Sequence, residues 1–410
     1  MKKIAIISSG YFPVPPVKGG AVETLIQTII DENEYTQQLH KLNIDVYCMD
    51  DIEACSISKK YRCTRYLFVK VPKIIEKLDE LIYFISYRVL KFRKHMSFRF
   101  IAQRIYYIYA VAKKLKTNDY DKVVIENTAT LFWTLKLFGN WKKYRGRYVY
   151  HLHNEVSSTF GCRKQVLATD EVWGISQFIN NSFCKLFPEY DPIRCRVLKN
   201  CINLSKFRNR GKDINIREKY GIHDNEKIII FAGRLCKEKG VKELLLAFTK
   251  INIDKLRLII VGNYYFGTDM VSSFETELFK IAKPLGRKVI FTGYIPNDQL
   301  AIYYNSADIA VLPSVWDEPA GLTILEAIAC GVPVITTNSG GIPEYVNNDC
   351  AIILNKDEKL DNELAVNIEV LLSDKKRMND MIRVGNELSI QFDKDKYFNN
   401  FIKLVSNNKN

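Results

Sequence analysis

Several patterns are missing from this 410-residue sequence, and each absence argues against a kind of protein. No apolar run approaches the roughly 18–20 residues that cross a bilayer, so no membrane-spanning helix is expected. The ten cysteines form no CxxC pair and do not cluster with the five histidines, which argues against a zinc site and a disulfide framework. They are typical of free thiols in a reducing cytoplasm, and the start "KIAIIS" is interpreted as a buried strand rather than a signal peptide.

Motifs of other protein classes are missing too. The first predicted strand is not followed by the G-x-G-x-x-G of a nicotinamide-dependent dehydrogenase, and no P-loop occurs. The D-x-D match "DKD" (393–395) lies in a polar C-terminal segment and is interpreted as solvated charge, not as the metal site of a metal-dependent transferase. Helix-turn-helix, RNA-recognition and zinc-finger patterns are absent, so no nucleic acid partner is expected.

Acidic residues are missing from Leu81 to Asn118, within a first half that holds nearly all of the net charge of +14. Residues 1–200 carry 32 Lys and Arg against 19 Asp and Glu. The acid-free stretch contains "YRVLKFRKHMSFRF" and "RIYYIYAVAKKLK", and basic helices with aromatic faces commonly lie on anionic membranes. We therefore expect a membrane partner, contacted by Arg88, Lys91, Arg93 and Lys94. A basic surface helix with core aromatics, or a single-stranded nucleic acid site, are the alternatives.

What is present is an alternation of short apolar runs and longer helical stretches, which indicates parallel α/β layers. The first half is predicted to form strands at 3–8, 122–126, 147–153 and 196–200. The pattern restarts near residue 200, with strands expected at 227–233, 256–262, 288–293, 308–313 and 333–337. Loops rich in glycine, proline or polar residues follow these runs, as in doubly wound sheets whose ligands gather at the carboxyl ends of strands. Two Rossmann-like domains facing a central cleft are predicted.

The stretch "DEPAGLTILEA" (317–327) places Glu318 and Glu326 on either side of an apolar run. The helix from "GLTILEAIA" follows a strand, so its amino end is expected at the carboxyl edge of the sheet, where unpaired amides attract an anion. Gly321 keeps that entrance clear of side chains. A buried carboxylate at Glu326 needs a partner, and two vicinal hydroxyls would serve. The alternative is a capping acid at Glu318 and an internal salt bridge at Glu326.

A second loop, "AGRLCKEKG" (232–240), puts Arg234 and Lys239 after a strand in the same domain. Two cations beside helix amides could stabilise a departing phosphate without a metal, although a basic loop is often just solvated. In the first domain, "VKGGAVE" (17–23) offers Gly19 and Gly20 for close approach of a substrate, or simply a flexible loop. "HLHNE" (151–155) offers His153 as a hydrogen-bonding group or as a structural histidine.

The run "WDEPAGLTILEAIACGVPVITTNSGGIPEYV" resembles the signature of retaining glycosyltransferases of family 4, which have the two-domain GT-B fold. Glu318 and Glu326 are similar to that family's E-x7-E motif. "GRLCKEKGV" resembles its basic diphosphate loop, "HLHN" its N-domain histidine and "KGGAVE" its acceptor-side loop. The likeness covers nearly the whole chain, including a hinge-like "VLKNCINLSKF" and a closing segment "FDKDKYFNNFIKLV". The basic insert around 81–118 has no counterpart.

The resemblance implies a role for each matching residue. Glu318 would contact hydroxyls of the donor sugar, and Glu326 would hold the ribose diol of the nucleotide. Arg234 and Lys239 would neutralise the diphosphate, helped by amides near Leu322 and Thr323. His153 would lie near the sugar across the cleft, and Gly19 and Gly20 would border the acceptor or a phosphate. The catalytic residues are then expected to be Glu318, His153, Arg234 and Lys239.

The resemblance also implies a domain division at 1–200, 201–386 and 387–410, the last segment being a helix that crosses back to the first domain. It favours transfer of a hexose from a UDP-hexose, with attack on the same face and the leaving phosphate taking the acceptor's proton; Glu318 as a covalent nucleophile is the alternative. No cofactor or metal is expected. The acceptor would be a saccharide or polyprenyl-diphosphate-linked saccharide for bacterial surface polysaccharide, reached by a cytoplasmic enzyme peripheral to the inner membrane face. An idle homologue stabilising a partner transferase, or a GT-B-fold sugar-nucleotide epimerase, are the alternatives.

Overall fold

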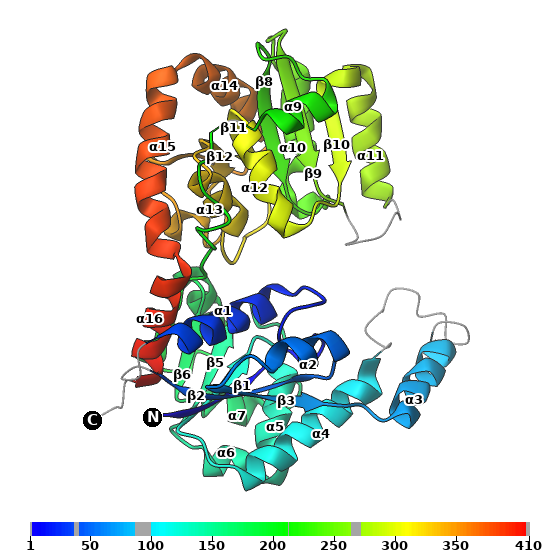
Figure 1. Cartoon of the computed structure of the whole chain (residues 1–410), viewed down its shortest axis with the longest axis vertical. Coiled ribbons are helices and arrows are strands. Elements are labelled where there is room, and N and C mark those ends of the chain that lie inside the picture. The colour runs from blue at the N-terminus through cyan, green and yellow to red at the C-terminus, as the bar shows by residue number, and fades with distance from the viewer. Residues whose placement is uncertain (1, 37–40, 87–99, 212, 264–271, 407–410) are drawn as a thin grey trace. The chain divides into compact units, whose positions relative to one another are not determined.

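The computed structural model of the chain describes residues 2–36, 41–86, 100–211, 213–263 and 272–406 (Figure 1). It divides into two compact units, one of residues 1–199 together with 397–410 and the other of residues 200–396. Each unit is an α/β domain built on one parallel sheet. None of the helices formed by the described residues combines the length and apolar character needed to cross a membrane.

The first unit contains a seven-stranded sheet in the order β3-β2-β1-β4-β5-β6-β7, with parallel pairing throughout. Its strands are β1 (Lys3–Ile7), β2 (Asn43–Met49), β3 (Thr64–Val69), β4 (Lys122–Glu126), β5 (Tyr148–Leu152), β6 (Glu171–Gly174) and β7 (Cys195–Val197). All residues of β4 and β5 are buried, as expected for a sheet covered on both faces. The strand order reverses between β1 and β4, which is where such a sheet binds its ligands.

Helices connect these strands. They are α1 (Ala21–Tyr35), α2 (Ile52–Ser58), α3 (Lys73–Phe84), α4 (Ile101–Thr117), α5 (Trp133–Lys136), α6 (Asn140–Lys143), α7 (Arg163–Leu167) and α8 (Gln177–Leu186), with a 3-10 turn, η4 (Ala129–Phe132), after β4. The buried Asp79 of α3 accepts the amide N–H of Ala102 at 2.7 Å and of Gln103 at 2.9 Å, so it caps the amino end of α4.

The second unit repeats the same topology in six strands, ordered β10-β9-β8-β11-β12-β13 and all parallel. The strands are β8 (Lys227–Ala232), β9 (Leu256–Val261), β10 (Val289–Gly293), β11 (Ile309–Leu312), β12 (Val334–Thr337) and β13 (Ala351–Leu354). Here the order reverses between β8 and β11. The carboxyl ends of these two strands carry the basic loop and the first glutamate that the sequence singled out.

The helices of the second unit are α9 (Ile214–Tyr220), α10 (Val241–Lys250), α11 (Ser273–Ala282), α12 (Asn297–Ser306), α13 (Leu322–Ala329), α14 (Leu360–Ser373) and α15 (Lys375–Ser389). Their apolar faces and the buried strands form one continuous core. Two short 3-10 turns follow strands of this sheet: η7 (Lys237–Lys239) after β8 and η9 (Ile342–Glu344) after β12.

The C-terminal segment belongs to both units. α15 continues to Ser389, and the 3-10 turn η10 (Ile390–Phe392) follows it before α16 (Lys394–Ser406) begins. From residue 397 onward the chain is part of the first unit, where Phe401 contacts Trp173 edge to face at a ring distance of 5.9 Å. The division predicted from sequence started this last segment at residue 387, whereas the structure keeps residues 387–396 with the second unit. The reason is that α15 is one uninterrupted helix, with Met381 and Gly385 buried in the second unit.

The nine predicted strands are present within three residues of their expected limits. Four strands were not predicted, namely β2, β3, β6 and β13. β3 mixes buried and exposed positions and β6 has only four residues, so neither forms a long apolar run. Arg88, Lys91, Arg93 and Lys94, the predicted membrane contacts, lie outside the described residues.

Candidate active site

The reversal of strand order between β8 and β11 brings two loops together in the second unit. The loop after β8 contains Arg234 and Lys239, and the loop after β11 contains Ser314 and Glu318. The carbonyl oxygen of Glu238 in the first loop accepts hydrogen bonds from Ser314 Oγ at 2.9 Å and from the amide of Val315 at 3.0 Å in the second. These bonds fix the distance between a basic loop and an acidic one.

Gly240 is what allows this close approach. Its φ is +69°, and a Cβ added there would lie 1.9 Å from the carbonyl oxygen of Pro313. No other residue type fits, because that distance is well inside van der Waals contact and the conformation itself disfavours a side chain. Gly240 also starts α10, so the basic loop is held on both sides.

Lys239 and Glu318 meet directly. Lys239 Nζ lies 2.6 Å from Glu318 Oε1, and Ser314 Oγ donates to the same oxygen at 2.6 Å. The lysine side chain is 28% exposed and the glutamate 15%, so this pair is partly shielded from water. Arg234 is exposed, and among the described residues its guanidinium makes no hydrogen bond or ion pair. One cation is therefore balanced and the other is open to an anion.

A third loop, which follows β12, holds the backbone of the Glu318 loop in place. After β12, the amide of Gly341 donates to the carbonyl oxygen of Glu318 at 2.7 Å, and the amide of Gly340 donates to Asp317 Oδ1 at 2.9 Å. Gly340 has a φ of +56°, and an added Cβ would lie 2.4 Å from that same carbonyl oxygen. The glycine-rich turn predicted after this strand thus holds the backbone of the acidic loop.

Glu326 lies within α13 and is 9% exposed. Its hydrogen bond from Asn297 Nδ2 is long, at 3.4 Å. Burial raises the pKa of Glu326 to about 7, and the Asn297 bond and the charge of Lys206 lower it only in part. A carboxylate so weakly satisfied favours a ligand that donates hydrogen bonds, and a diol is such a ligand.

The amino end of α13 begins after Gly321, which makes no side-chain cap. The first amides of a helix have no partner inside the helix, so those of Leu322 and Thr323 are available to a ligand or to water. The Thr323 carbonyl accepts from the Tyr304 hydroxyl at 3.2 Å, which ties α13 to α12. The structure thus places Gly321, Leu322 and Thr323 at the same sheet edge as the two loops.

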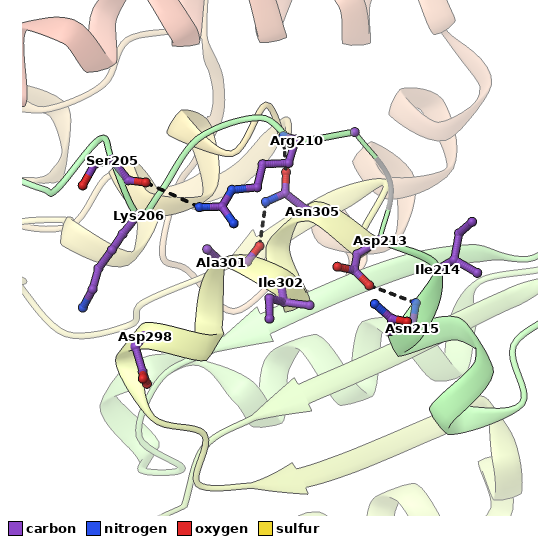
Figure 2. Close-up of a pocket in the computed structure, with 11 residues that line it drawn as sticks. Ser205, Lys206, Arg210, Asp213, Ile214, Asn215, Asp298, Ala301, Ile302 and Asn305 are labelled. Atoms are coloured by element: carbon purple, nitrogen blue, oxygen red, sulfur yellow. Dashed lines mark hydrogen bonds between the residues drawn. The ribbon is translucent and has the colours of Figure 1, made fainter.

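A separate pocket of about 460 Å³ lies between the 205–215 segment and α12 (Figure 2). Its wall includes Lys206, Arg210, Asp298 and Asn305. Arg210 donates its amide to Asn305 Oδ1 at 3.0 Å, so the pocket wall is braced by its own residues. None of the residues predicted from sequence lines this pocket. One residue of its wall, Lys206, affects a predicted site residue, because its charge lowers the pKa of Glu326.

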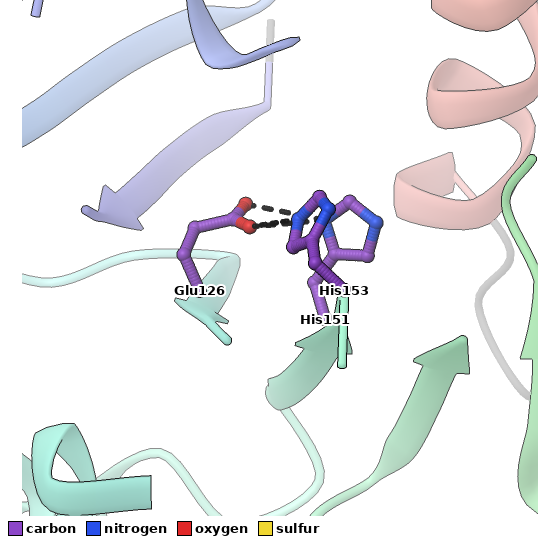
Figure 3. Close-up of side chains that lie close together, drawn as sticks. All are labelled: Glu126, His151 and His153. Atoms are coloured by element: carbon purple, nitrogen blue, oxygen red, sulfur yellow. Dashed lines mark hydrogen bonds and ion pairs between the residues drawn. The ribbon is translucent and has the colours of Figure 1, made fainter. Parts of the chain in front are cut away.

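In the first unit, His153 belongs to a buried cluster at the ends of β4 and β5 (Figure 3). Its Nε2 lies 3.0 Å from Glu126 Oε2, and His151 Nδ1 lies 3.1 Å from the same oxygen. The amide of His153 donates to Asn127 Oδ1 at 3.1 Å, and Asn127 has a φ of +57°. One carboxylate therefore orients two imidazoles.

The charges in this cluster follow from burial and pairing. Burial by itself would raise the pKa of Glu126, but the charge and hydrogen bonds of His151 and His153 outweigh it and bring the pKa to about 2. Burial lowers the pKa of His153, and the neighbouring His151 lowers it further. Glu126 is thus ionised at neutral pH. Glu126, His151 and His153 each offer one ligand atom, all within 4.8 Å of one another, so these three could hold a metal ion.

The glycine pair before α1 has two different environments. Gly19 has open space where a side chain would be, with a φ of +79°. Gly20 has a φ of +107°, and its added Cβ would lie 2.2 Å from Glu23 Oε2. Glu23 is buried, accepts a hydrogen bond from Ser9 Oγ, and has its pKa raised by that burial. Gly20 is required for the packing of Glu23, while Gly19 leaves the surface of the loop accessible.

Comparison with known proteins agrees with this arrangement. Residues 212–387, which include Arg234, Lys239, Glu318 and Glu326, match the family described as Glycosyl transferases group 1. Residues 212–387 form a domain of the group 1 glycosyltransferases. Among relatives of the glycosyltransferase, "Putative glycosyltransferase YtcC" of Bacillus subtilis (strain 168) is 27% identical over 395 residues, covering 93% of this chain and 86% of the relative.

Two further matches extend over most of the glycosyltransferase chain. A lipopolysaccharide 1,2-N-acetylglucosaminetransferase of Salmonella typhimurium (strain LT2) is 24% identical over 360 residues, which is 84% of this chain and 83% of the relative. The crystal structure of Anabaena Alr3699/HepE in complex with UDP aligns with a TM-score of 0.70 at 19% identity, covering 99% of this chain and all of the other. The glycosyltransferase has the GT-B fold, with two Rossmann-like domains.

Several residues of the site were not singled out from the sequence of the glycosyltransferase. Ser314, Glu126, His151 and Glu23 were missed. Glu23 and His151 lie inside the stretches "VKGGAVE" and "HLHNE", so a closer reading of those stretches could have found them. Glu126 ends a predicted strand, and a carboxylate at a strand's carboxyl end in a doubly wound sheet was the available signal. Nothing in the sequence pairs Ser314 with Glu318.

Proposed function

We propose that this glycosyltransferase is a retaining, metal-independent hexosyltransferase that moves a hexose from UDP-hexose to a saccharide or lipid-linked saccharide acceptor. The proposal is supported by the contact of Lys239 with Glu318, on two loops that, with Arg234, follow neighbouring strands at the sheet edge where α13 begins. Two cations and free helix amides are what a nucleoside diphosphate requires, and a carboxylate next to them is what a sugar requires. The UDP complex of the Anabaena protein of the same fold supports the choice of nucleotide.

In this proposal the nucleotide and the sugar occupy different parts of the carboxyl edge of the second sheet. Glu326 accepts hydrogen bonds from both ribose hydroxyls, which compensates its burial. Arg234 and Lys239 bind the diphosphate, and the amides of Leu322 and Thr323 add donors without charge. Glu318 then accepts from hydroxyls of the hexose. Because Lys239 is paired with Glu318, donor binding replaces that ion pair with contacts to phosphate and sugar.

The chemistry proposed is attack on the same face as departure. The bond between the anomeric carbon and the phosphate oxygen breaks, the acceptor oxygen bonds to that carbon, and the acceptor's proton passes to the leaving phosphate. Negative charge grows on the diphosphate as its bond breaks, so pre-oriented cations and amides lower the barrier. His153, oriented by Glu126, is proposed to bind a sugar hydroxyl. Glu318 as a covalent nucleophile is the less favoured route, because its Oε1 already accepts a hydrogen bond from Ser314 Oγ.

The acceptor is proposed to be part of a bacterial surface polysaccharide and to be presented at an anionic membrane. The Salmonella relative, which acts on lipopolysaccharide by its name, supports the first point. For the second, α3 exposes Ile74 (75%), Leu78 (45%) and Leu81 (53%) at helical spacing, and the acid-free basic stretch begins at Leu81. An exposed apolar face next to cations is typical of helices that lie on membranes.

The donor and the metal requirement are tested in one assay. Nucleotide release from UDP-, GDP- and ADP-hexoses, with bacterial lipid extract as acceptor source and EDTA present, is compared for wild type, Glu326→Gln and the exposed control Glu358→Gln. We expect release from a UDP-hexose that persists in EDTA, is lost in Glu326→Gln and is retained in Glu358→Gln. Loss in EDTA, with a stoichiometric metal found in the purified protein, would refute metal independence and direct attention to Glu126, His151 and His153.

Two alternatives give different results in that assay. An epimerase of this fold would convert the sugar nucleotide without transfer, which product analysis detects. An idle homologue would release nothing from any donor although folded, and would instead raise the activity of a partner transferase.

Membrane binding is tested by co-sedimentation with anionic vesicles after charge reversal at Arg88, Lys91, Arg93 and Lys94. The control reverses Lys375, Lys376, Arg377 and Lys396 of the second unit. Vesicle binding that survives the first reversal would refute this surface.

A further inference from the structure

Arg104 of α4 is a buried cation that no carboxylate balances. Its side chain is 8% exposed, and its Nε and Nη1 are buried without any hydrogen-bond partner. The third nitrogen, Nη2, donates to Thr130 Oγ1 at 2.8 Å, a neutral partner. Burial lowers the pKa of Arg104, but a guanidinium stays protonated at neutral pH. A permanent charge is therefore enclosed with two donors unused.

No carboxylate of the first unit can account for this charge. Among the residues that the structure describes, Arg104 forms no ion pair. The remaining residues of the first unit, 1, 37–40, 87–99 and 407–410, carry no aspartate or glutamate. The aromatic neighbours compensate only partly: the guanidinium carbon lies 4.6 Å from the ring centre of Tyr11 and 6.0 Å from that of Tyr107. Burying an unpaired charge costs several kcal/mol, so a missing anion is the simplest physical explanation.

The position of Arg104 is that of a ligand site. Its guanidinium lies against Gly10, which follows β1, and it bonds to Thr130 in the turn after β4. These two strands flank the reversal of strand order in the first sheet, where a doubly wound sheet binds its ligand. Gly10 has a φ of +72°, and a Cβ there would lie 2.5 Å from Arg104 Nη1. A side chain at position 10 would collide with this donor and with the ring of Tyr107, 2.6 Å from that Cβ.

We propose that Arg104 binds a phosphoryl group of the acceptor, which it contacts with Nη1–H at the β1/β4 edge of the first unit. The inference rests on the proposed function, because it names the charged part of the acceptor. An Nη1–H group of a protonated guanidinium gives a charge-assisted hydrogen bond to a phosphoryl oxygen. Tyr11, whose ring covers the guanidinium and is about half exposed, is the side chain that turns aside when the anion enters.

The direct test uses inorganic pyrophosphate as the probe and isothermal titration of the full chain. Saturating UDP is added first, so that the phosphate-binding loops of the second unit are occupied. Wild type, Arg104→Met, Arg104→Lys and Lys113→Met are compared; Lys113 is an exposed residue of the same helix and undergoes the same loss of charge. We expect about a 10- to 100-fold loss of pyrophosphate affinity in Arg104→Met, a smaller loss in Arg104→Lys, and no change in Lys113→Met.

Thermal unfolding separates binding from a purely structural role. If the role of Arg104 is to bind an anion, Arg104→Met without pyrophosphate should unfold at the same or a higher temperature than wild type, because an unpaired buried charge has been removed. A lower unfolding temperature with unchanged pyrophosphate affinity would overturn the proposal. Should Arg104→Met fail to fold, equal affinity of wild type and Arg104→Lys would overturn it as well.

The UDP titration that precedes each experiment tests the proposed function separately. No UDP binding, with pyrophosphate binding that depends on Arg104, would refute the UDP donor and keep the anion site. Vesicles of phosphatidylcholine with and without phosphatidic acid then identify the source of the phosphoryl group. Co-sedimentation that depends on both phosphatidic acid and Arg104 supports a lipid-borne group. Arg104-dependent binding of pyrophosphate alone supports a soluble phosphorylated acceptor.

Discussion

Lys239 Nζ lies 2.6 Å from Glu318 Oε1, although the two residues are 79 positions apart in the sequence. The contact exists because β8 and β11 are neighbours in the sheet and because Glu238 and Gly240 hold the two loops against each other. It pairs the cation proposed for the diphosphate with the acid proposed for the sugar. The diphosphate would therefore replace Glu318 as the partner of Lys239, and a sugar hydroxyl would replace Lys239 as the partner of Glu318.

Removal of the Lys239 charge should weaken catalysis more than removal of a neighbouring one. We expect Lys239→Met to lower kcat/KM for the nucleotide sugar by about 10- to 100-fold, since a charge-assisted hydrogen bond contributes roughly 1.5–3 kcal/mol. Lys237→Met removes the same charge from the same loop at an exposed position and should leave the value near wild type. Steady-state kinetics at fixed ionic strength measure both. Equal effects would mean that the loop acts only through its overall charge.

The elevated pKa of Glu326 predicts a pH dependence of donor binding. With a pKa of about 7 in the folded chain, Glu326 is largely protonated at pH 6 and largely ionised at pH 8. An ionised carboxylate accepts from both ribose hydroxyls, so the KM for the donor should fall as the pH rises through 7. In Glu326→Gln the KM should be higher and nearly constant across this range. A wild-type KM that does not change between pH 6 and 8 would contradict this role.

The raised pKa of Glu326 also predicts that folding stability falls as the pH rises. Its pKa is raised above the unfolded value of 4.5, so between pH 4.5 and 7 the folded chain binds more protons than the unfolded chain. Folding stability from this group therefore falls as the pH rises through that window. Glu326→Gln removes the effect, and its stability relative to wild type should rise by up to about 3 kcal/mol from pH 4.5 to 7. Urea unfolding of both variants at several pH values measures the difference.

Glu126 should control the protonation of His153. Its carboxylate accepts from His153 Nε2–H, which leaves Nδ1 without the proton. Glu126→Gln replaces one acceptor with a donor, so we expect a mixture of His153 tautomers and a loss in kcat of about 10-fold or more. Nitrogen-15 chemical shifts of the imidazole report the tautomer directly. The control is Glu155→Gln, an exposed residue two positions after His153, and it should change neither the shifts nor kcat.

The close approach at Gly240 predicts a large cost for a single methyl group. Gly240→Ala would place Cβ 1.9 Å from the Pro313 carbonyl oxygen, whereas Gly221→Ala meets nothing within 4 Å. Both positions have similar positive φ, of +69° and +61°, so the second variant isolates the cost of the conformation. We expect Gly221→Ala to lose about 1–2 kcal/mol and Gly240→Ala about 3 kcal/mol or more. Similar losses in denaturant unfolding would show that the loops separate without cost.

Much of this protein follows from local features of its sequence. Buried strands are apolar runs followed by turn residues, so nine of them and the two Rossmann-like domains were predictable. Glu318 and Glu326 are eight positions apart, and the loop and helix that carry them are set by Gly321 and the apolar run between them. Four strands were not predicted because their apolar runs are short or mixed with polar residues.

The contacts that give these residues their chemistry were decided by tertiary structure. The pairing of Lys239 with Glu318, the shared carboxylate of Glu126 and the isolation of Arg104 each depend on which strands are neighbours and how deeply a side chain is buried. Sequence spacing carries information about periodicity along one element, while distances between loops far apart in the chain are set by sheet order and close packing. For this reason the sequence determined which residues could act, and only the folded chain decided which of them meet.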